Sequence, residues 1–506
     1  MKNYRVSRLF WNNKYGMKKQ ALYIGIALLI KFSFFFVFSY LMSPEDFKQG
    51  HYFFLAGDSK EYIDPVENLL KTGEHKTADG SYAKRTPGYT PVYLMYRLFL
   101  DKPWALNITL FFQVILSAIS CYILALLASS VFKSPKLFFW TFWLYTISTY
   151  VSIWDNYVLT ESFATSSLIF CLYALHLFVK EKNWKWLLFS GLMLTWCVFL
   201  RPYMAPFLGL LSLFIFLNTH KSLKTISVSL LVFLSPMIIS EISWVARNYR
   251  VMKEFVPLQS NVSYNDKEAF NSDNDIKPHI ADFVKAFGGD LTWWNPRGES
   301  YWFFNGDVET SRNIFPSIIF NDSLNFERLK EVKRLCIEGG SNSLSKNQLA
   351  TNKEKIRTEL KSFHDTYVNE HPIHFLFVSR LIHIKNFVFH SGVYNIPFEV
   401  YEKQTVPEKL TKTFYALLYL FTMTLGWGFL IIFLSGNIKP DSLKLYFMLI
   451  PVWIIILFPI VFKTHEYRFS TLSYPFLLVM MCLGMLKLID IAKQKGLINF
   501  ERKTIE

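Results

Sequence analysis

The feature that most constrains this chain is a series of long apolar runs. A helix needs roughly 20 apolar residues to cross a bilayer, and about 17 suffice in the shortest cases. Runs of this kind recur along the sequence and predict about ten membrane-spanning helices. They are expected at residues 21–42, 106–131, 137–153, 160–179, 184–200, 203–218, 224–246, 412–434, 444–462 and 468–489. The sequence therefore predicts a mostly α-helical, polytopic membrane protein.

The composition agrees with a membrane location and argues against a nucleic-acid partner. The 506 residues are 52% hydrophobic and include 50 Phe, 27 Tyr and 14 Trp, more aromatic side chains than a soluble core of this length would bury. The formal net charge is +15, but the basic residues form short clusters between apolar runs and no single stripe. We therefore expect membrane lipids with anionic head groups, rather than nucleic acid, as the counterpart of this charge.

The basic residues also predict the orientation of the chain. They gather in the N-terminal segment, in alternate short loops and at the C-terminus, whereas the loops between them carry few. The positive-inside rule then puts both termini in the cytoplasm. The Phe-, Asn- and Lys-rich composition favours a bacterial inner membrane.

Two long polar segments divide the chain into three regions. We expect an N-terminal transmembrane region with a first outer loop at 43–105, an extracytoplasmic domain, and a C-terminal transmembrane region with a cytoplasmic tail. The three regions are residues 1–246, 247–411 and 412–506. Charges interrupt two shorter apolar stretches, 91–100 and 373–392, which predicts helices lying at the membrane interface. For 373–392, the alternative is an eleventh, re-entrant element.

Charged residues gather at the outer ends of the predicted helices. A charge inside the bilayer costs about 2.5 to 3.5 kcal/mol on insertion scales and is usually retained for a purpose. The gathered residues are Asp58, Glu61, Arg85, Glu161, Arg201, Glu241, Arg247, Lys463, His465, Glu466 and Arg468. Only Lys31 lies part-way along a span, where snorkelling or an internal ion pair would explain it. A transporter would carry its charges near the midplane, so we expect a site at the outer membrane face.

Carboxylates and cations at this depth suit the transfer of a sugar from a lipid phosphate. The lipid tail would lie in the bilayer, and Arg and Lys would hold the phosphate by charge-assisted hydrogen bonds. A carboxylate on the other side of the reacting carbon would take the proton of an incoming hydroxyl. Opposite charges on opposite sides of that carbon predict an inverting reaction.

Several segments resemble one known family. "AGDSKEYIDPVENLLKTG", followed by "KRTPGYTPVYLMY", resembles the first outer loop of the GT-C membrane glycosyltransferases that use polyprenyl- or dolichyl-phosphate sugars. This group includes the protein O-mannosyltransferases, glycosyltransferase family 39, and the bacterial aminoarabinose transferase of lipid A. Three further pieces fit the pattern: "LTESFATSSLIF", "ARNYRVMKEFVPLQSN" and "THEYRFSTLSYPFLL". The resemblance covers most of residues 20–260 and 410–490, and implies a GT-C-like fold.

By this resemblance, Asp58 stands where the family keeps its catalytic aspartate, as general base or as the group that orients the acceptor. Many relatives carry an adjacent Asp-Glu pair, whereas here Ser59 follows and the next acid is Glu61, the second catalytic candidate. The alternatives are an N-cap for Asp58 and an exposed helix acid for Glu61.

The candidates for binding the donor phosphate or sugar are basic. They are Arg85, Arg201, Arg247, Lys463, His465 and Arg468. For the three arginines that come first, the alternative is a solvated loop or helix end. Glu161 opens a predicted span, where an acid also suits the helix dipole.

The sequence supports no cofactor. Asp273 and Asp275 form a D-x-D arrangement, but they lie in an Asn- and Asp-rich loop, so we predict no metal. The predicted function is an inverting glycosyltransferase that moves a sugar from a polyprenyl-phosphate donor to a hydroxyl of a lipid, glycan or protein. The alternatives are a transporter or flippase of lipid-linked glycans, and a scaffold subunit without turnover.

Overall fold

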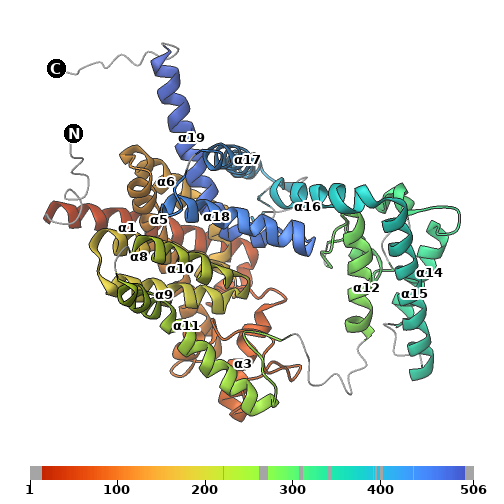
Figure 1. Cartoon of the computed structure of the whole chain (residues 1–506). Helices are drawn as coiled ribbons and strands as arrows, with labels where there is room; N and C mark the ends of the chain where they lie inside the picture. Colours follow the sequence, from red (N-terminus) through yellow and green to blue (C-terminus); the bar gives the residue numbers. More distant parts are fainter. Residues whose placement is uncertain are drawn as a thin grey trace. The chain divides into compact units, whose positions relative to one another are not determined.

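The structure is a computed structural model, and its described part is mostly helical (Figure 1). It describes residues 14–219, 222–260, 272–293, 295–306, 311–339, 345–390, 392–393, 396–398, 403–436 and 438–495. Within these residues, the only β-type pairing is an isolated bridge between Phe54 and Tyr157. The chain forms two compact units. The first is Met1–Tyr264, Ser391–Pro451 and Thr471–Glu506, and the second is Asn265–His390 and Val452–Ser470.

Seven helices of the described part are long and apolar enough to cross a membrane. They are α1 (Lys14–Met42), α5 (Lys102–Val131), α8 (Glu161–Glu181), α11 (Leu223–Met252), α17 (Val406–Leu434), α18 (Leu443–Ile455) continued by the π-helical η7 (Ile456–Phe462), and α19 (Tyr474–Gln494). Two shorter apolar helices, α9 (Trp184–Leu200) and α10 (Pro206–Asn218), are joined by the 3-10 helix η2 (Pro202–Met204). The predicted mostly helical, polytopic fold is confirmed.

The span predicted at 137–153 is interrupted. It consists of α6 (Pro135–Ile147), α7 (Thr149–Ser152) and the 3-10 helix η1 (Ile153–Asn156). The break falls at Ser148, whose backbone is extended and whose Oγ donates to the Tyr474 hydroxyl at 2.9 Å. At the far end, Asn156 Nδ2 donates to the carbonyl of Phe35 at 2.8 Å. The interrupted segment therefore runs beside α1 and returns the chain to the end of the bundle that carries the first loop.

Lys31 is buried within the first unit and has partners there. Its Nζ donates to Ser152 Oγ at 2.8 Å and lies 3.8 Å from Asp155 Oδ2. Both charged side chains are almost completely inaccessible to solvent. The predicted internal ion pair of Lys31 is confirmed, and it joins α1 to the interrupted segment.

The first loop contains three short helices: α2 (Pro44–Lys48), α3 (Ser59–Thr72) and α4 (Thr90–Arg97). Helix α3 buries Tyr62, Ile63 and Val66, which share one face because Val66 follows Tyr62 by four residues and Ile63 by three. It ends at Gly73, whose φ of 77° favours glycine. Helix α4 matches the helix predicted at 91–100, and Glu67 joins α3 to it by accepting a hydrogen bond from Arg97 Nε at 2.9 Å.

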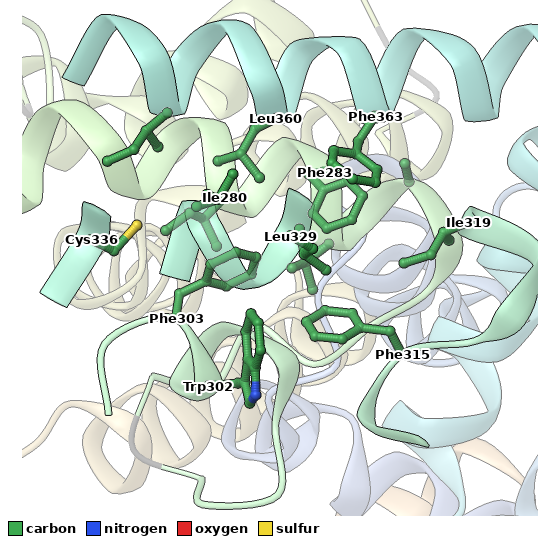
Figure 2. Packing of buried hydrophobic residues seen from close by; sticks show 14 of the residues in the cluster. Ile280, Phe283, Trp302, Phe303, Phe315, Ile319, Leu329, Cys336, Leu360 and Phe363 are labelled. Carbon is green, nitrogen blue, oxygen red and sulfur yellow. The ribbon is translucent and has the colours of Figure 1, made fainter. Parts of the chain in front are cut away.

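The second unit has its own aromatic core. Its longer helices are α12 (Ser272–Phe287), α14 (Phe326–Gly339), α15 (Lys346–Glu370) and α16 (Ser379–Val388), together with the short α13 (Glu299–Trp302) and the π-helical η5 (His374–Val378). Helix α15 packs beside α12 and α14. Figure 2 shows Phe283, Trp302, Phe315 and Phe363 turned toward one another, and the Trp302 and Phe315 rings meet edge to face at 5.0 Å. The predicted helix at 373–392 corresponds to η5 and α16.

Candidate active site

Two carboxylates and one guanidinium meet in the first loop. Asp58 immediately precedes α3, Glu61 lies in its first turn, and Arg85 belongs to the segment between α3 and α4. Arg85 Nε donates to Glu61 Oε2 at 2.6 Å, and Arg85 Nη2 lies 3.4 Å from Asp58 Oδ2. Residues three apart share a helix face, which explains how one guanidinium reaches both acids. The structure thus brings together three of the predicted site residues.

Asp58 does not cap helix α3 with its side chain, so the capping alternative is wrong. Asp58 occupies the N-cap position of α3, but its side chain makes no capping hydrogen bond. The Ser59 hydroxyl instead accepts from the Ala56 amide at 2.8 Å and organises the turn before the helix. The Asp58 carboxylate therefore faces Arg85 rather than the helix end.

The cluster is partly open to solvent. The side chains of Asp58, Glu61 and Arg85 keep between 21% and 31% of their accessible surface. Burial alone would lower the pKa of the Arg85 guanidinium, but Tyr62, Glu61 and Asp58 raise that pKa above its ordinary value. Arg85 therefore stays charged and compensates the negative charge of the two acids.

Lys84 is a member of this cluster that the sequence analysis missed. Its Nζ lies 3.1 Å from Glu61 Oε1 and 2.8 Å from Asp79 Oδ2. Burial would raise the pKa of Asp79, but hydrogen bonds from Lys84 and Thr77 hold it below its ordinary range. The sequence offered one signal for Lys84, its position next to Arg85 in "KRTPGY". Two neighbouring cations can pair with the same group of acids.

The segment that carries Arg85 is fixed to the end of α9. Thr86 Oγ1 donates to the Phe199 carbonyl at 2.6 Å, and the Gly88 amide donates to the same oxygen at 3.2 Å. A Cβ on Gly88 would lie 2.4 Å from that oxygen, so only glycine fits this close approach. The sequence Thr-Pro-Gly after Arg85 thus sets where the guanidinium sits.

Glu161 and Arg201 form a buried ion pair beside this cluster. Glu161 opens α8 as predicted, and Arg201 follows the last residue of α9. Burial would lower the pKa of Arg201, but Glu161 raises it above its ordinary value. Tyr62 interacts electrostatically with both Arg201 and Arg85. Arg201 is buried and paired with Glu161, and its binding of the donor phosphate stays a prediction.

Arg247 braces the first loop. Its Nη1 donates to the Tyr82 carbonyl at 2.7 Å, and its Nη2 donates to the carbonyl of His75. The guanidinium also lies 5.0 Å from the centre of the Trp244 ring. Arg247 therefore holds backbone in place, and its binding of the donor stays a prediction.

The remaining three predicted residues belong to the second unit and do not act as one group there. His465 Nε2 lies 3.3 Å from Asp290 Oδ1, and its Nδ1 lies 3.2 Å from His383 Nδ1. Burial would raise the pKa of Asp290, but the hydrogen bond from His465 lowers it to about 2. Arg468 pairs with Glu466, whereas the Lys463 ammonium lies over the Phe375 ring.

The three residues therefore have separate partners in the second unit. Asp290 and His383 were not predicted, since neither belongs to a recognisable motif.

Metal binding has little support in the described part of the chain. No group of three or more His, Cys, Asp or Glu side chains there could hold a metal ion. The predicted independence of metal stays a prediction.

Comparisons with known proteins find matches among solved structures. No model of a known protein family matches the sequence, and no curated protein matches it.

The archaeal oligosaccharyltransferase AglB from Archaeoglobus fulgidus, in complex with an inhibitory peptide and a dolichol-phosphate, is 11% identical with a TM-score of 0.46. The apo form of the Archaeoglobus fulgidus oligosaccharyltransferase is 12% identical with a TM-score of 0.47. Each match covers 97% of this chain and 53% of the other, so the chain spans about half the length of these structures.

The Asp58 cluster has the groups that proton transfer beside a departing anion requires. A half-exposed carboxylate can accept the proton of a hydroxyl. Arg85 keeps its Nη1 without a hydrogen-bond partner among the described residues, and Lys84 is about one-third exposed. Both cations can therefore meet an anion that enters from the solvent side.

Proposed function

We propose that the protein is an inverting glycosyltransferase. It moves a sugar from a polyprenyl-phosphate donor to a hydroxyl of a lipid, glycan or protein acceptor at the non-cytoplasmic face of a bacterial inner membrane, with both chain termini in the cytoplasm. The observation that carries this proposal is the pairing of Asp58 and Glu61 with Arg85 at the end of the bundle where α1 ends and α5 and α8 begin. The sequence resemblance of the first loop supports the same reaction.

In the proposed reaction, Asp58 is the general base. Its carboxylate takes the proton of the acceptor hydroxyl while that oxygen attacks the anomeric carbon from the face opposite the phosphate. The bond between this carbon and the phosphate oxygen breaks, and its electron pair leaves with the polyprenyl phosphate. The configuration at the anomeric carbon is inverted. A positioned base of this kind contributes about 10²- to 10⁴-fold to the rate.

Arg85 does not lie where a residue that binds the sugar donor was expected. The sequence analysis put the cations across the reacting carbon from the acids, whereas Arg85 binds both acids directly. We therefore assign it first to positioning Asp58 and Glu61. A phosphate that leaves across the carbon from Asp58 would be met by cations other than Arg85 and Lys84, because these two contact the acids themselves.

A transfer assay with purified protein tests this proposal. Radiolabelled polyprenyl-phosphate sugars and candidate acceptors would be supplied to wild type, to Asp58→Asn and to Asp64→Asn. Asp64 is a matched control because it lies on the same helix and makes no ion pair among the described residues. We expect transfer by wild type and Asp64→Asn, and a loss of about 100-fold or more in Asp58→Asn. Equal transfer by all three proteins would remove Asp58 from the mechanism.

A second candidate function, transport or flipping of lipid-linked glycans, is favoured by one observation. Lys31 and Asp155 are a buried pair on neighbouring helical segments, which is the arrangement expected of a transporter. Movement of a labelled lipid-linked glycan across proteoliposomes, unchanged by Asp58→Asn and lost in Asp155→Asn, would support it. If the purified protein transferred no sugar from any donor, that result would also favour transport.

A further inference from the structure

A polar pocket lies within the second unit and shares no residue with the Asp58 cluster. Its volume is about 510 Å³. Three segments line it: α12, the C-terminal half of α15, and the last residues of η7 with Lys463. Because these segments are distant in sequence, the folding of the unit itself assembles the pocket.

Three lysines face this pocket, one from each segment. Lys285 comes from α12, Lys361 from α15, and Lys463 follows η7. Among the described residues, no carboxylate lies within ion-pair distance of any of the three ammonium groups. Cations that gather without paired acids repel one another, and an anion between them would relieve this repulsion.

The acids of the pocket do not cancel this charge. Two aspartates line it, and one of them, Asp365, lies 2.9 Å from His364 Nδ1. The pocket is lined by three lysines and two aspartates, so its net charge is +1 when the histidines are counted as neutral. The pocket is therefore suited to an anion.

Lys463 is held in place rather than extended into solvent. Its backbone is left-handed, with φ of 50°, and its Nζ lies 3.8 Å from the centre of the Phe375 ring. Burial, and then Arg380 and Lys285, lower the pKa of Lys463 to about 8. An ordered ammonium beside other cations loses little entropy when it binds an anion.

We propose that this pocket binds a phosphate ester carried by the acceptor. Lysine ammonium groups bind phosphate as point charges. The volume falls in the range of small-molecule sites and exceeds what a phosphate alone would fill, so a sugar or glycerol attached to the phosphate has room. That the ligand is the acceptor rests on the proposed function, whereas anion binding by the pocket does not.

The same phosphate chemistry has two sources, a lipid head group and a soluble phosphorylated glycan. Calorimetry with the full-length protein in detergent separates these two sources. The probes are glycerol 3-phosphate for the soluble source, dihexanoyl phosphatidic acid for the lipid source, and glycerol as the probe without phosphate. The proteins compared are wild type, the double variant Lys285→Gln and Lys463→Gln, and Lys355→Gln. Lys355 is a matched control because it is an exposed lysine of α15 that does not line the pocket.

We expect saturable binding of a phosphate probe by wild type and Lys355→Gln, weakened at least tenfold in the double variant and by added salt. Tighter binding of the lipid probe would identify a lipid acceptor, and tighter binding of glycerol 3-phosphate a soluble one. No saturable binding by wild type, or equal binding by the double variant, would overturn the proposal. Phosphate binding without sugar transfer by wild type would instead overturn the proposed function and leave an anion site.

Discussion

Arg85 Nε and Glu61 Oε2 are joined by a hydrogen bond of 2.6 Å across 24 residues of the chain. This bond closes the first loop onto the opening turn of α3. It also fixes the second contact of the guanidinium, because Nη2 then lies 3.4 Å from Asp58. The position of the proposed base is therefore set by one planar cation shared between two acids.

Replacing Arg85 with lysine is expected to reduce sugar transfer at least tenfold. A single ammonium cannot reproduce the fork that reaches Glu61 and Asp58 together. The transfer assay with Arg85→Lys and Lys60→Arg measures this, since Lys60 is an exposed neighbour on α3. Full activity of Arg85→Lys would show that the charge alone matters.

Gly88→Ala is expected to destabilise the first loop and reduce transfer. Its Cβ would meet the backbone of Phe199 at 2.4 Å, and overpacking of this kind costs about 1 to 3 kcal/mol. Gly57→Ala is the matched control, because a Cβ there meets nothing within 4 Å. Thermal unfolding in detergent and the transfer assay measure both effects. Equal behaviour of the two variants would contradict the proposed role of the Phe199 contact.

Arg201→Met is expected to destabilise the first unit by about 3 to 5 kcal/mol, because it leaves the Glu161 carboxylate buried without its cation. The double variant Glu161→Leu and Arg201→Met should recover most of this loss. As a control, Arg328→Met removes the exposed pair with Glu359 and should cost about 1 kcal/mol or less. Equilibrium unfolding in detergent distinguishes the three, and additive losses in the double variant would argue against a coupled pair.

Acid is expected to weaken the second unit between about pH 6.5 and pH 4. Burial, and then His465, lower the pKa of His383 from 6.5 to about 4. In this interval the unfolded chain binds a proton that the folded chain excludes, so stability falls as pH falls, by up to about 1.4 kcal/mol per pH unit for one group. His383→Gln should flatten the pH dependence of the unfolding temperature. An identical slope in wild type and variant would show that other groups cause it.

The sequence predicts the spans well because each depends on its own apolar run. Where a span is broken, as at Ser148, the side chain at the break bonds to Tyr474, and a partner so distant in the chain leaves no periodic signal. Asp58, Glu61 and Arg85 were found because they lie within one loop of recognisable pattern.

Proximity in sequence was a poorer guide to the cluster at Lys463, His465 and Arg468. The left-handed backbone at Lys463 and the 3-10 helix η8 (Tyr467–Leu472) separate the directions of these side chains. Each consequently has its own partners. The contacts of Arg247 could not be predicted from the sequence, since its partners are backbone carbonyls and no side-chain motif marks them.

Those two carbonyl acceptors belong to His75 and Tyr82. Every residue type offers a backbone carbonyl, so these two bonds require no specific side chain at either position. Substitutions could therefore accumulate along this part of the loop, and diversify what it recognises, while a single arginine on α11 preserves its shape.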